Sequence, residues 1–198
     1  MRQRGAHWLL GRGSCIDLPT PRLKGKFAIP SLFNVTLVLG GARSGKSRHA
    51  ETLLMRHAGP WVYVATGEPL DDEMRQRIAD HERRRGPGWR TFEEPIALSE
   101  AIIATSELPV LVDCLTLWLT NLMLGDHDIE AASAALEAAL AARPAPTILV
   151  SNEVGLGLVP DTGLGRAFRD QAGRLNQRIA AQAGRVLFMV AGLPLTVK

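Results

Sequence analysis

The stretch Val35-Thr36-Leu37-Val38-Leu39-Gly40-Gly41-Ala42-Arg43-Ser44-Gly45-Lys46-Ser47 decides the fold of this chain. Its first five residues are apolar or β-branched, which is typical of a buried strand, and a helix is predicted over residues 46–56. Residues 40–47, between them, fit the pattern G-x-x-x-x-G-K-[ST] in the strand–loop–helix context that this pattern requires. The stretch therefore predicts a phosphate-binding loop (P-loop) in a nucleotide-binding protein.

The residues of this loop contribute different groups to a bound triphosphate. Its glycines let backbone N–H groups turn toward phosphate oxygens, and the following helix directs its positive end at the same anion. We expect Lys46 to reach the β- and γ-phosphates and the Ser47 hydroxyl to bind Mg²⁺. The nucleotide-binding residues predicted here are Gly40, Gly41, Ala42, Arg43, Ser44, Gly45, Lys46 and Ser47.

Beyond the loop, short apolar strands alternate with helices. Further strands are predicted at 61–65, 89–92, 110–113, 148–150 and 185–191. Helices are predicted at 71–85, 96–105, from the end of the 110–113 strand through 124, at 129–142 with Asp128 as N-cap, and at 164–183. This alternation predicts a single α/β domain of the P-loop (RecA-like) kind, with a mainly parallel sheet and helices on both faces.

Charge divides the chain into two parts. The 198 residues carry a net charge of +3 and have a pI near 9.2. Residues 1–33 hold six basic side chains and one acidic one, whereas residues 34–198 have a net charge of −2. We interpret residues 1–33 as a flexible basic N-terminal extension and residues 34–198 as the P-loop domain. Because the domain itself is slightly acidic, no nucleic-acid partner is expected.

Cysteine content and hydropathy predict a cytoplasmic protein. Cys15 and Cys114 are too few for a disulfide framework, so both are expected to be reduced thiols. The longest apolar run, residues 110–124, is broken by Asp113 and Asn121 and is shorter than the ~18 residues of a spanning helix. The basic N-terminus lacks the continuous apolar segment of a signal peptide. No membrane span is therefore predicted.

Two carboxylates follow predicted core strands. A P-loop protein needs an acidic side chain near Mg²⁺ at the end of a neighbouring strand, and Asp113 is the best candidate. Asp113 is alternatively a cap for the helix that follows it. Glu153 has two interpretations: it faces the expected nucleotide site together with Asp113, or it is a loop carboxylate that accepts hydrogen bonds from backbone N–H groups.

His81 lies in the strongly charged helix predicted over residues 71–85. On a helix, Arg77 and Arg85 flank it at a spacing of four residues and Arg84 at a spacing of three. Guanidinium groups at these positions hold phosphate oxygens and disfavour imidazolium, which keeps a nucleophilic nitrogen free near neutral pH. From the residues alone, a solvated charged helix with an incidental histidine is the favoured interpretation.

An ordered series of segments, rather than the P-loop alone, carries a resemblance to a known family. These are residues 40–48, Ala65-Thr66, Asp71-Asp72-Glu73-Met74, Arg77-Ile78 with His81, Trp89-Arg90-Thr91, Asn121-Leu122, Asn152-Glu153-Val154-Gly155, Val159-Pro160 and 168–177. On these segments, nearly the whole chain from residue 35 onward resembles the bifunctional adenosylcobinamide kinase/adenosylcobinamide-phosphate guanylyltransferase family of cobalamin biosynthesis.

The resemblance implies two reactions. A nucleoside triphosphate, ATP or GTP, phosphorylates adenosylcobinamide, and GTP then transfers GMP to that phosphate through a guanylylated histidine, with Mg²⁺ as cofactor. His81 matches this histidine, so the implied catalytic residues are His81 and Lys46. Besides the loop, the implied nucleotide contacts are Ala65, Thr66, Gly67, Glu82, Arg83, Arg84, Arg85, Glu93 and Asp113. The implied metal ligands are Ser47 and Asp113, the implied partner is a corrinoid, and the implied assembly is a homotrimer.

Two positions depart from the family pattern. Gly67 replaces a serine or alanine, and Asp113 stands where some relatives have glutamate. Two other functions remain compatible with the residues alone: a small-molecule P-loop kinase without nucleotidyl transfer, and a nucleotide-gated binding module.

Overall fold

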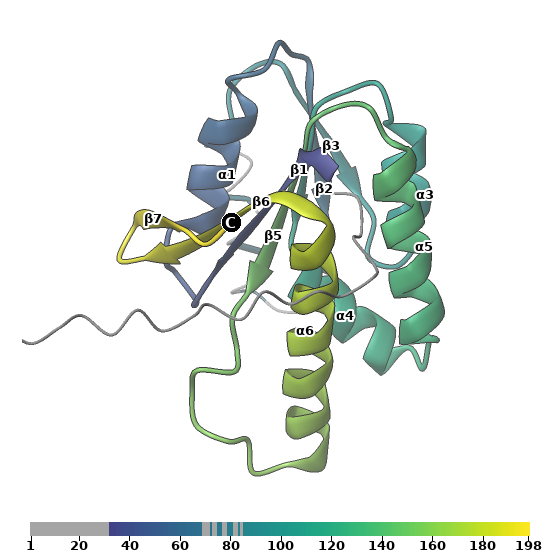
Figure 1. Ribbon diagram of the computed structural model, residues 1–198, viewed down its shortest axis with the longest axis vertical. Helices are drawn as coiled ribbons and strands as arrows, with labels where there is room; N and C mark the ends of the chain where they lie inside the picture. The colour runs from purple at the N-terminus through teal and green to yellow at the C-terminus, as the bar shows by residue number, and fades with distance from the viewer. Residues whose placement is uncertain (1–31, 69–71, 73–74, 77–78, 81–82, 84) are drawn as a thin grey trace, which may run out of the picture.

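A computed structural model describes residues 32–68, 72, 75–76, 79–80, 83 and 85–198, and the structural statements below concern these residues. Seven strands form one sheet in the order β3-β2-β4-β5-β1-β6-β7 (Figure 1). The first six in chain order are parallel, and β7 pairs antiparallel with β6 at one edge. The strands are β1 Leu32–Gly40, β2 Trp61–Ala65, β3 Trp89–Glu93, β4 Val110–Asp113, β5 Thr147–Asn152, β6 Ala183–Val190 and β7 Leu193–Thr196.

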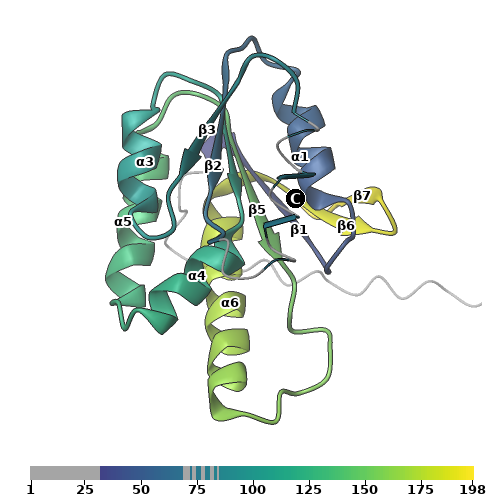
Figure 2. The same ribbon diagram turned by 180° about the vertical axis from the view of Figure 1, so that it is seen from behind.

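Helices cover the two faces of this sheet unequally. In Figures 1 and 2, α1 lies on one face, and α3, α4, α5 and α6 lie on the other. Their bounds are α1 Lys46–Leu54, α3 Leu98–Ala104, α4 Leu115–Leu124, α5 Ile129–Ala142 and α6 Gly163–Gln182. Successive side chains of a strand point to opposite faces, so Leu111 packs in the cluster with α1 while Val110 and Val112 pack in the cluster beneath the other helices. Two cores result, one on each side of the sheet.

The α/β class, the mainly parallel sheet and the helices on both faces are confirmed. Some boundaries differ from the predictions. The 96–105 helix begins two residues late, at Leu98, because the Glu94 carboxylate accepts hydrogen bonds from the backbone N–H groups of Ile96 (3.1 Å) and Ala97 (2.7 Å). β7 was not predicted, since it is short and contains Pro194, a residue tolerated in a sheet only at an edge.

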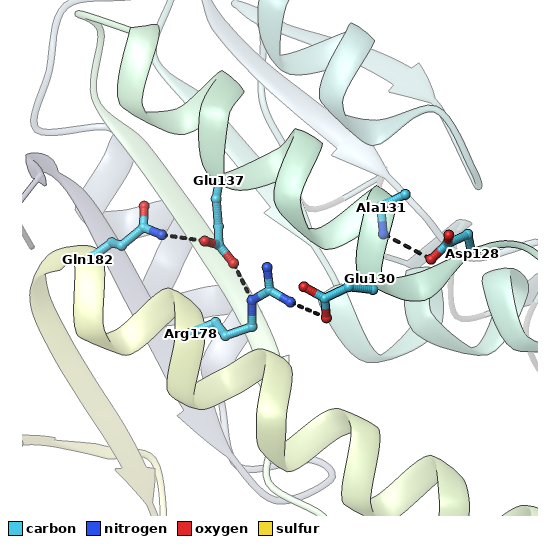
Figure 3. A network of polar contacts seen from close by, with 6 residues as sticks. All are labelled: Asp128, Glu130, Ala131, Glu137, Arg178 and Gln182. Atoms are coloured by element: carbon cyan, nitrogen blue, oxygen red, sulfur yellow. Dashed lines mark hydrogen bonds and ion pairs between the residues drawn. The ribbon is translucent and has the colours of Figure 1, made fainter.

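Polar side chains cap α5 at its start and join α5 to α6. Asp128 is the N-cap of α5, and its carboxylate accepts a hydrogen bond from Ala131 N (2.9 Å), as predicted. Arg178 on α6 donates to Glu137 and to Glu130 (2.7 Å) on α5, and Gln182 donates to Glu137 (2.7 Å; Figure 3). These polar contacts join α5 and α6.

Arg143 anchors α5 to the end of α3. It is only 4% exposed, and its guanidinium donates to the carbonyl oxygens of Ile102 and Thr105 (both 2.8 Å) and Leu108, and to the Thr147 hydroxyl (2.7 Å). Burial lowers the pKa of Arg143 to about 10, which still leaves it charged at pH 7. This role was not predicted, because nothing near Arg143 in the chain identifies carbonyl partners some 35 to 41 residues away.

Candidate functional site

The predicted phosphate-binding loop forms a tight turn between β1 and α1. Gly45 is the N-cap of α1 with φ 91°, and Arg43 also has a positive φ of 54°. Lys46 opens the helix, is 7% exposed, and donates from Nζ to the Gly41 carbonyl oxygen (2.6 Å). The loop thus gathers the eight predicted residues around the positive end of α1, where a phosphate group is stabilised.

Gly40 cannot carry a side chain. A Cβ placed on it would lie 2.8 Å from the Met189 carbonyl oxygen on β6 and 2.8 Å from Ser44 Oγ, and its φ is +151°. Ser44 Oγ is itself buried and has no hydrogen-bond partner among the described residues. A buried hydroxyl without a partner is costly, so its position inside the loop fits a group that bonds an anion.

Three of the predicted nucleotide contacts lie in one row at the carboxyl end of the sheet. Ala65, the last residue of β2, pairs in register with Glu93 of β3 and with Asp113 of β4. β5 lies between β4 and β1, so Asp113 and the loop that follows Gly40 lie at the same sheet edge. The parallel topology therefore brings together residues that are far apart in the chain.

Asp113 does not occupy the capping position of the helix that follows it. The N-cap of α4 is Cys114, whereas the Asp113 carboxylate accepts a hydrogen bond from the Tyr63 hydroxyl (2.8 Å). Ser47 and Asp113 are both half-buried and offer hydroxyl and carboxylate oxygens. Mg²⁺ commonly binds one or two protein oxygens together with substrate phosphates, so the chemistry of this donor set fits that ion. No group of three or more His, Cys, Asp or Glu among the described residues is arranged to hold a metal by itself.

The Thr66 hydroxyl group forms hydrogen bonds with the backbone of another segment. Its side chain is completely buried, and Oγ1 donates to Cys114 O and accepts from Cys114 N (both 2.8 Å). Its carbonyl oxygen accepts from the Asn121 amide (2.7 Å). These bonds tie the residue that follows β2 to the N-cap of α4 and to Asn121 within α4. The neighbours of Thr66 in the chain, Ala65 and Gly67, are half-buried. The Thr66 hydroxyl is therefore bonded within the protein, and the nucleotide contact at residues 65–67 stays a prediction.

Glu153 lies next to the phosphate-binding loop but is held by its own segment. Its backbone N–H donates to the Gly40 carbonyl oxygen (3.0 Å), and its carboxylate accepts from Gly155 N (2.6 Å). Of the two interpretations offered for Glu153, the loop carboxylate bonded to a backbone N–H is the one the structure supports.

The charged helix predicted over residues 71–85 is only partly within the described residues. Asp72, residues 75–76 and 79–80, and Arg83 are helical, while His81, Glu82 and Arg84 lie outside the described residues. Arg83 is 69% exposed and pairs with Asp80, so at that position the helix is solvated.

Arg85 differs from Arg83 because it is packed against the sheet. Its guanidinium carbon lies 3.6 Å from the centroid of the Tyr63 ring, and its Nη2 donates to Thr91 Oγ1 (3.1 Å). Of the two described residues in the range 82–85, Arg85 and not Arg83 contacts the strands of the site.

Tyr63 and Asn152 belong to this region but were not predicted to do so. Tyr63 is 4% exposed, and its pKa is raised well above the ordinary value, first by burial and then by the nearby Asp113 carboxylate. Asn152, paired with Gly40, donates to Thr116 Oγ1 (2.8 Å), and its carbonyl oxygen accepts from Asn176 on α6 (3.2 Å). Strand alternation was the one signal for Tyr63, since it points to the same face as Asp113.

The parallel sheet, the loop geometry and the row of strand ends define a P-loop nucleotide-binding protein of the α/β class. A family model described as cobinamide kinase/cobinamide phosphate guanyltransferase matches residues 36–197. The chain belongs to this family of enzymes, which confirms the resemblance and the function that it implied. The two alternative functions are thereby disfavoured.

Relatives with assigned names agree. The bifunctional adenosylcobalamin biosynthesis protein CobP of Pseudomonas aeruginosa is 49% identical over 166 residues, covering 82% of this chain and 96% of that protein. The proteins named CobU of Escherichia coli and Salmonella typhimurium are each 44% identical and cover 82% of this chain and 98% of their own length.

Two solved structures have more distant similarity. The flagellar accessory protein FlaH from Methanocaldococcus jannaschii is 12% identical, with a TM-score of 0.48 over 86% of this chain and 80% of that one. The ATPase domain of G40P is 14% identical, with a TM-score of 0.43 over 80% and 69%. Within the described part of the chain, no helix combines the length and apolar character needed to cross a bilayer.

Proposed function

We propose that this chain phosphorylates adenosylcobinamide with ATP or GTP and then transfers GMP from GTP to the product, giving adenosyl-GDP-cobinamide and pyrophosphate. The observation that carries the proposal is the family match over residues 36–197. The geometry at Gly40 and Lys46 supports it, because Gly40 lies too close to Met189 and Ser44 to carry a Cβ, and the Lys46 ammonium lies inside the same loop, bonded to the Gly41 carbonyl oxygen.

In the kinase step, the aminopropanol hydroxyl of the corrinoid attacks the γ-phosphorus. The bond to the bridging oxygen breaks, the nucleoside diphosphate leaves, and the hydroxyl proton is released. Lys46 and the loop N–H groups stabilise the charge on the β- and γ-phosphates. Ser47 and Asp113 are the proposed ligands of Mg²⁺, which supplies further charge neutralisation when bound.

In the guanylyl step, a ring nitrogen of His81 attacks the α-phosphorus of GTP. The bond between that phosphorus and the bridging oxygen breaks, and pyrophosphate leaves with the electron pair. A phosphate oxygen of adenosylcobinamide phosphate then attacks the same phosphorus, the P–N bond breaks, and free imidazole is regenerated. Glu82, Arg83, Arg84 and Arg85, together with Glu93, are the proposed nucleotide contacts on this side.

The assembly, compartment and domain limits are also proposed. We infer a homotrimer in the cytoplasm, with residues 34–198 as the catalytic domain. Since β1 begins at Leu32, two residues of the range assigned to the extension belong to the sheet. A chain truncated before Leu32 is expected to keep both activities, and loss of guanylyl transfer by a folded truncation would contradict this assignment.

Incubation of the protein with α-labelled GTP and Mg²⁺ tests the covalent route. We expect acid-labile, base-stable label on the wild-type chain and none on His81→Ala. His57→Ala is a matched control, because His57 is an exposed histidine outside the site. Active protein without label would exclude the guanylyl-histidine.

Two other outcomes would favour the alternative functions. Transfer of the γ-phosphoryl group to the substrate, without α-label on the protein and with full kinase activity in His81→Ala, would favour a kinase alone. Nucleoside triphosphate hydrolysis that polynucleotide stimulates and cobinamide does not affect would favour a binding module.

A further inference from the structure

Tyr63 contacts two parts of the candidate site: Asp113, at the end of β4, and Arg85, four residues after the candidate histidine. It lies on β2, in register with Thr91 on β3 and Leu111 on β4, and its side chain packs in the cluster on the α1 face. Its hydroxyl donates to Asp113 Oδ2 at 2.8 Å. The carboxylate thus has one oxygen oriented by a buried donor, which fixes the direction in which the side chain lies.

The face of the same ring carries Arg85. The guanidinium carbon lies 3.6 Å from the ring centroid, within the range of a cation–π interaction, and Thr91 accepts a hydrogen bond from its Nη2 (3.1 Å). Arg85 follows His81 by four residues in the chain. Through one side chain, the sheet therefore contacts both the carboxylate at the end of β4 and the end of the segment that carries the candidate histidine.

The charges around Tyr63 suit this position. The Tyr63 phenol interacts electrostatically with two negative groups, Asp113 and, more weakly, Glu51 of α1. It also interacts with one positive group, the Arg85 guanidinium. A phenol is a neutral donor with an electron-rich face, so it bonds an anion at its edge and a cation on its face without adding net charge. Phenylalanine preserves only the second of these contacts.

We propose that Tyr63 is a positioning residue that holds Asp113 through its hydroxyl and Arg85 through its ring, and so aligns the metal-side carboxylate with the segment that follows His81. This inference rests on the proposed function. Both reactions use the metal side, so both depend on the hydroxyl. Only guanylyl transfer uses the histidine segment, so it alone depends on the ring.

Three variants separate these roles. In Tyr63→Phe, the Mg²⁺ concentration for half-maximal rate is expected to rise about tenfold for both reactions, because a charge-assisted hydrogen bond is lost. In Tyr63→Leu, guanylylation is expected to fall by about a further fivefold relative to the kinase rate, because the ring is lost as well. The control Thr91→Val removes the hydroxyl partner of Arg85 and is expected to leave the Mg²⁺ dependence unchanged.

A purely structural role for Tyr63 would lower both rates in proportion to the folded fraction. It would change neither the Mg²⁺ midpoint nor the ratio of the two reactions, and that result overturns the proposal. If Tyr63→Leu does not fold, Tyr63→Phe still tests the hydroxyl. A wild-type chain that neither phosphorylates cobinamide nor accepts α-label contradicts the proposed function instead.

A spectroscopic readout does not depend on turnover. Tyr63 is the only tyrosine in the chain, so protein labelled with fluorotyrosine gives one ¹⁹F resonance from this position. We expect saturating Mg²⁺ and GTP to shift that resonance, and Asp113→Asn to alter its position before nucleotide is added. A resonance unchanged by both would overturn the coupling of Tyr63 to the site.

Discussion

The two faces of the sheet are built from the same strands but hold buried charge differently. On the α1 face, Lys46 and Glu51 of α1 are buried, and Asp113 lies half-buried at the end of β4. On the four-helix face, the buried charged side chain among the described residues is Arg143, which donates to three backbone carbonyl groups.

This difference shows how one fold separates stability from chemistry. Arg143 is bonded by carbonyl oxygens within the protein, so its charge serves packing. Lys46 is placed at a loop whose N–H groups and Ser44 hydroxyl suit an incoming phosphate. Charge on the α1 face is therefore expected to matter for activity, and charge on the other face for stability.

Replacement of the loop lysine is expected to have the largest effect. Lys46→Met removes the cation that stabilises phosphate charge, so both activities should fall by about 10²–10³-fold with little change in the free energy of unfolding. Rate measurements and thermal unfolding check this. Lys198→Met, at the exposed C-terminus, is the control. Near-wild-type rates in Lys46→Met would contradict the expectation that charge on the α1 face matters for activity.

Replacement of the buried arginine should have the opposite profile. Arg143→Met leaves the carbonyl groups of Ile102, Thr105 and Leu108 without their donor, and we expect a loss of about 3 kcal/mol in the free energy of unfolding. Denaturant titration measures it. Arg166→Met is the matched control, because Arg166 also donates to backbone carbonyls but is exposed. Reduced activity per folded molecule would argue against a purely structural role.

A pair of glycine variants compares close packing with open space inside one loop. Gly40→Ala forces a Cβ to within 2.8 Å of the Met189 carbonyl oxygen, so we expect about 2 kcal/mol of destabilisation and weaker nucleotide binding. Gly41→Ala meets nothing within 4 Å and should change stability by less than about 0.5 kcal/mol. Calorimetry and nucleotide titration distinguish them, and equal effects would contradict the close packing of Gly40 against β6.

The contacts of Arg178 at the outer side of the four-helix face should contribute less. Arg178→Gln removes its bonds to Glu130 and Glu137, and we expect a loss of at most about 1 kcal/mol that shrinks at high salt (Figure 3). Arg169→Gln, which separates an exposed pair with Asp170, serves as the control. A salt-independent loss of several kcal/mol would contradict this prediction, because it would mean that the Arg178 ion pairs contribute as much as buried ion pairs do.

The smallest effect is confined to alkaline pH. Burial and Asp113 raise the pKa of Tyr63 above 10, so the folded chain keeps a phenol proton that the unfolded chain has lost. This contribution to stability is complete below pH 10 and is lost as pH rises through the folded pKa. Above pH 10, we expect the free energy of unfolding to fall more steeply with pH in the wild type than in Tyr63→Phe. We also expect phenolate absorbance to appear at a higher pH in the folded chain than in the unfolded chain. The same pH dependence of stability in the wild type and Tyr63→Phe would contradict this prediction.

Local patterns predicted most of the architecture. The strands at 61–65 and 110–113 and the helix at 129–142 have the predicted bounds, because each has an apolar pattern and a clear boundary residue such as Asp128. The strand at 193–196 was missed, since its proline argues against a strand unless its edge position is known.

The candidate site was predictable wherever one segment carries the chemistry. The loop at 40–47 and the strand-end position of Asp113 followed from motif and pattern. The role of Tyr63 did not, because its partners Asp113 and Arg85 are 50 and 22 residues away in the chain. The Thr66 bonds to Cys114, across 48 residues, were hidden for the same reason.

The sequence by itself determined the phosphate-binding loop, the alternation of strands and helices, and the family, since each is encoded in residues close together or in ordered motifs. Only the tertiary structure decided which alternatives hold. It assigned Asp113 to Tyr63 rather than to a helix cap, turned the Glu153 carboxylate toward Gly155, and made Arg143 a buried anchor. The physical reason is that hydrogen bonds between distant segments depend on strand order and register, which a linear pattern does not contain.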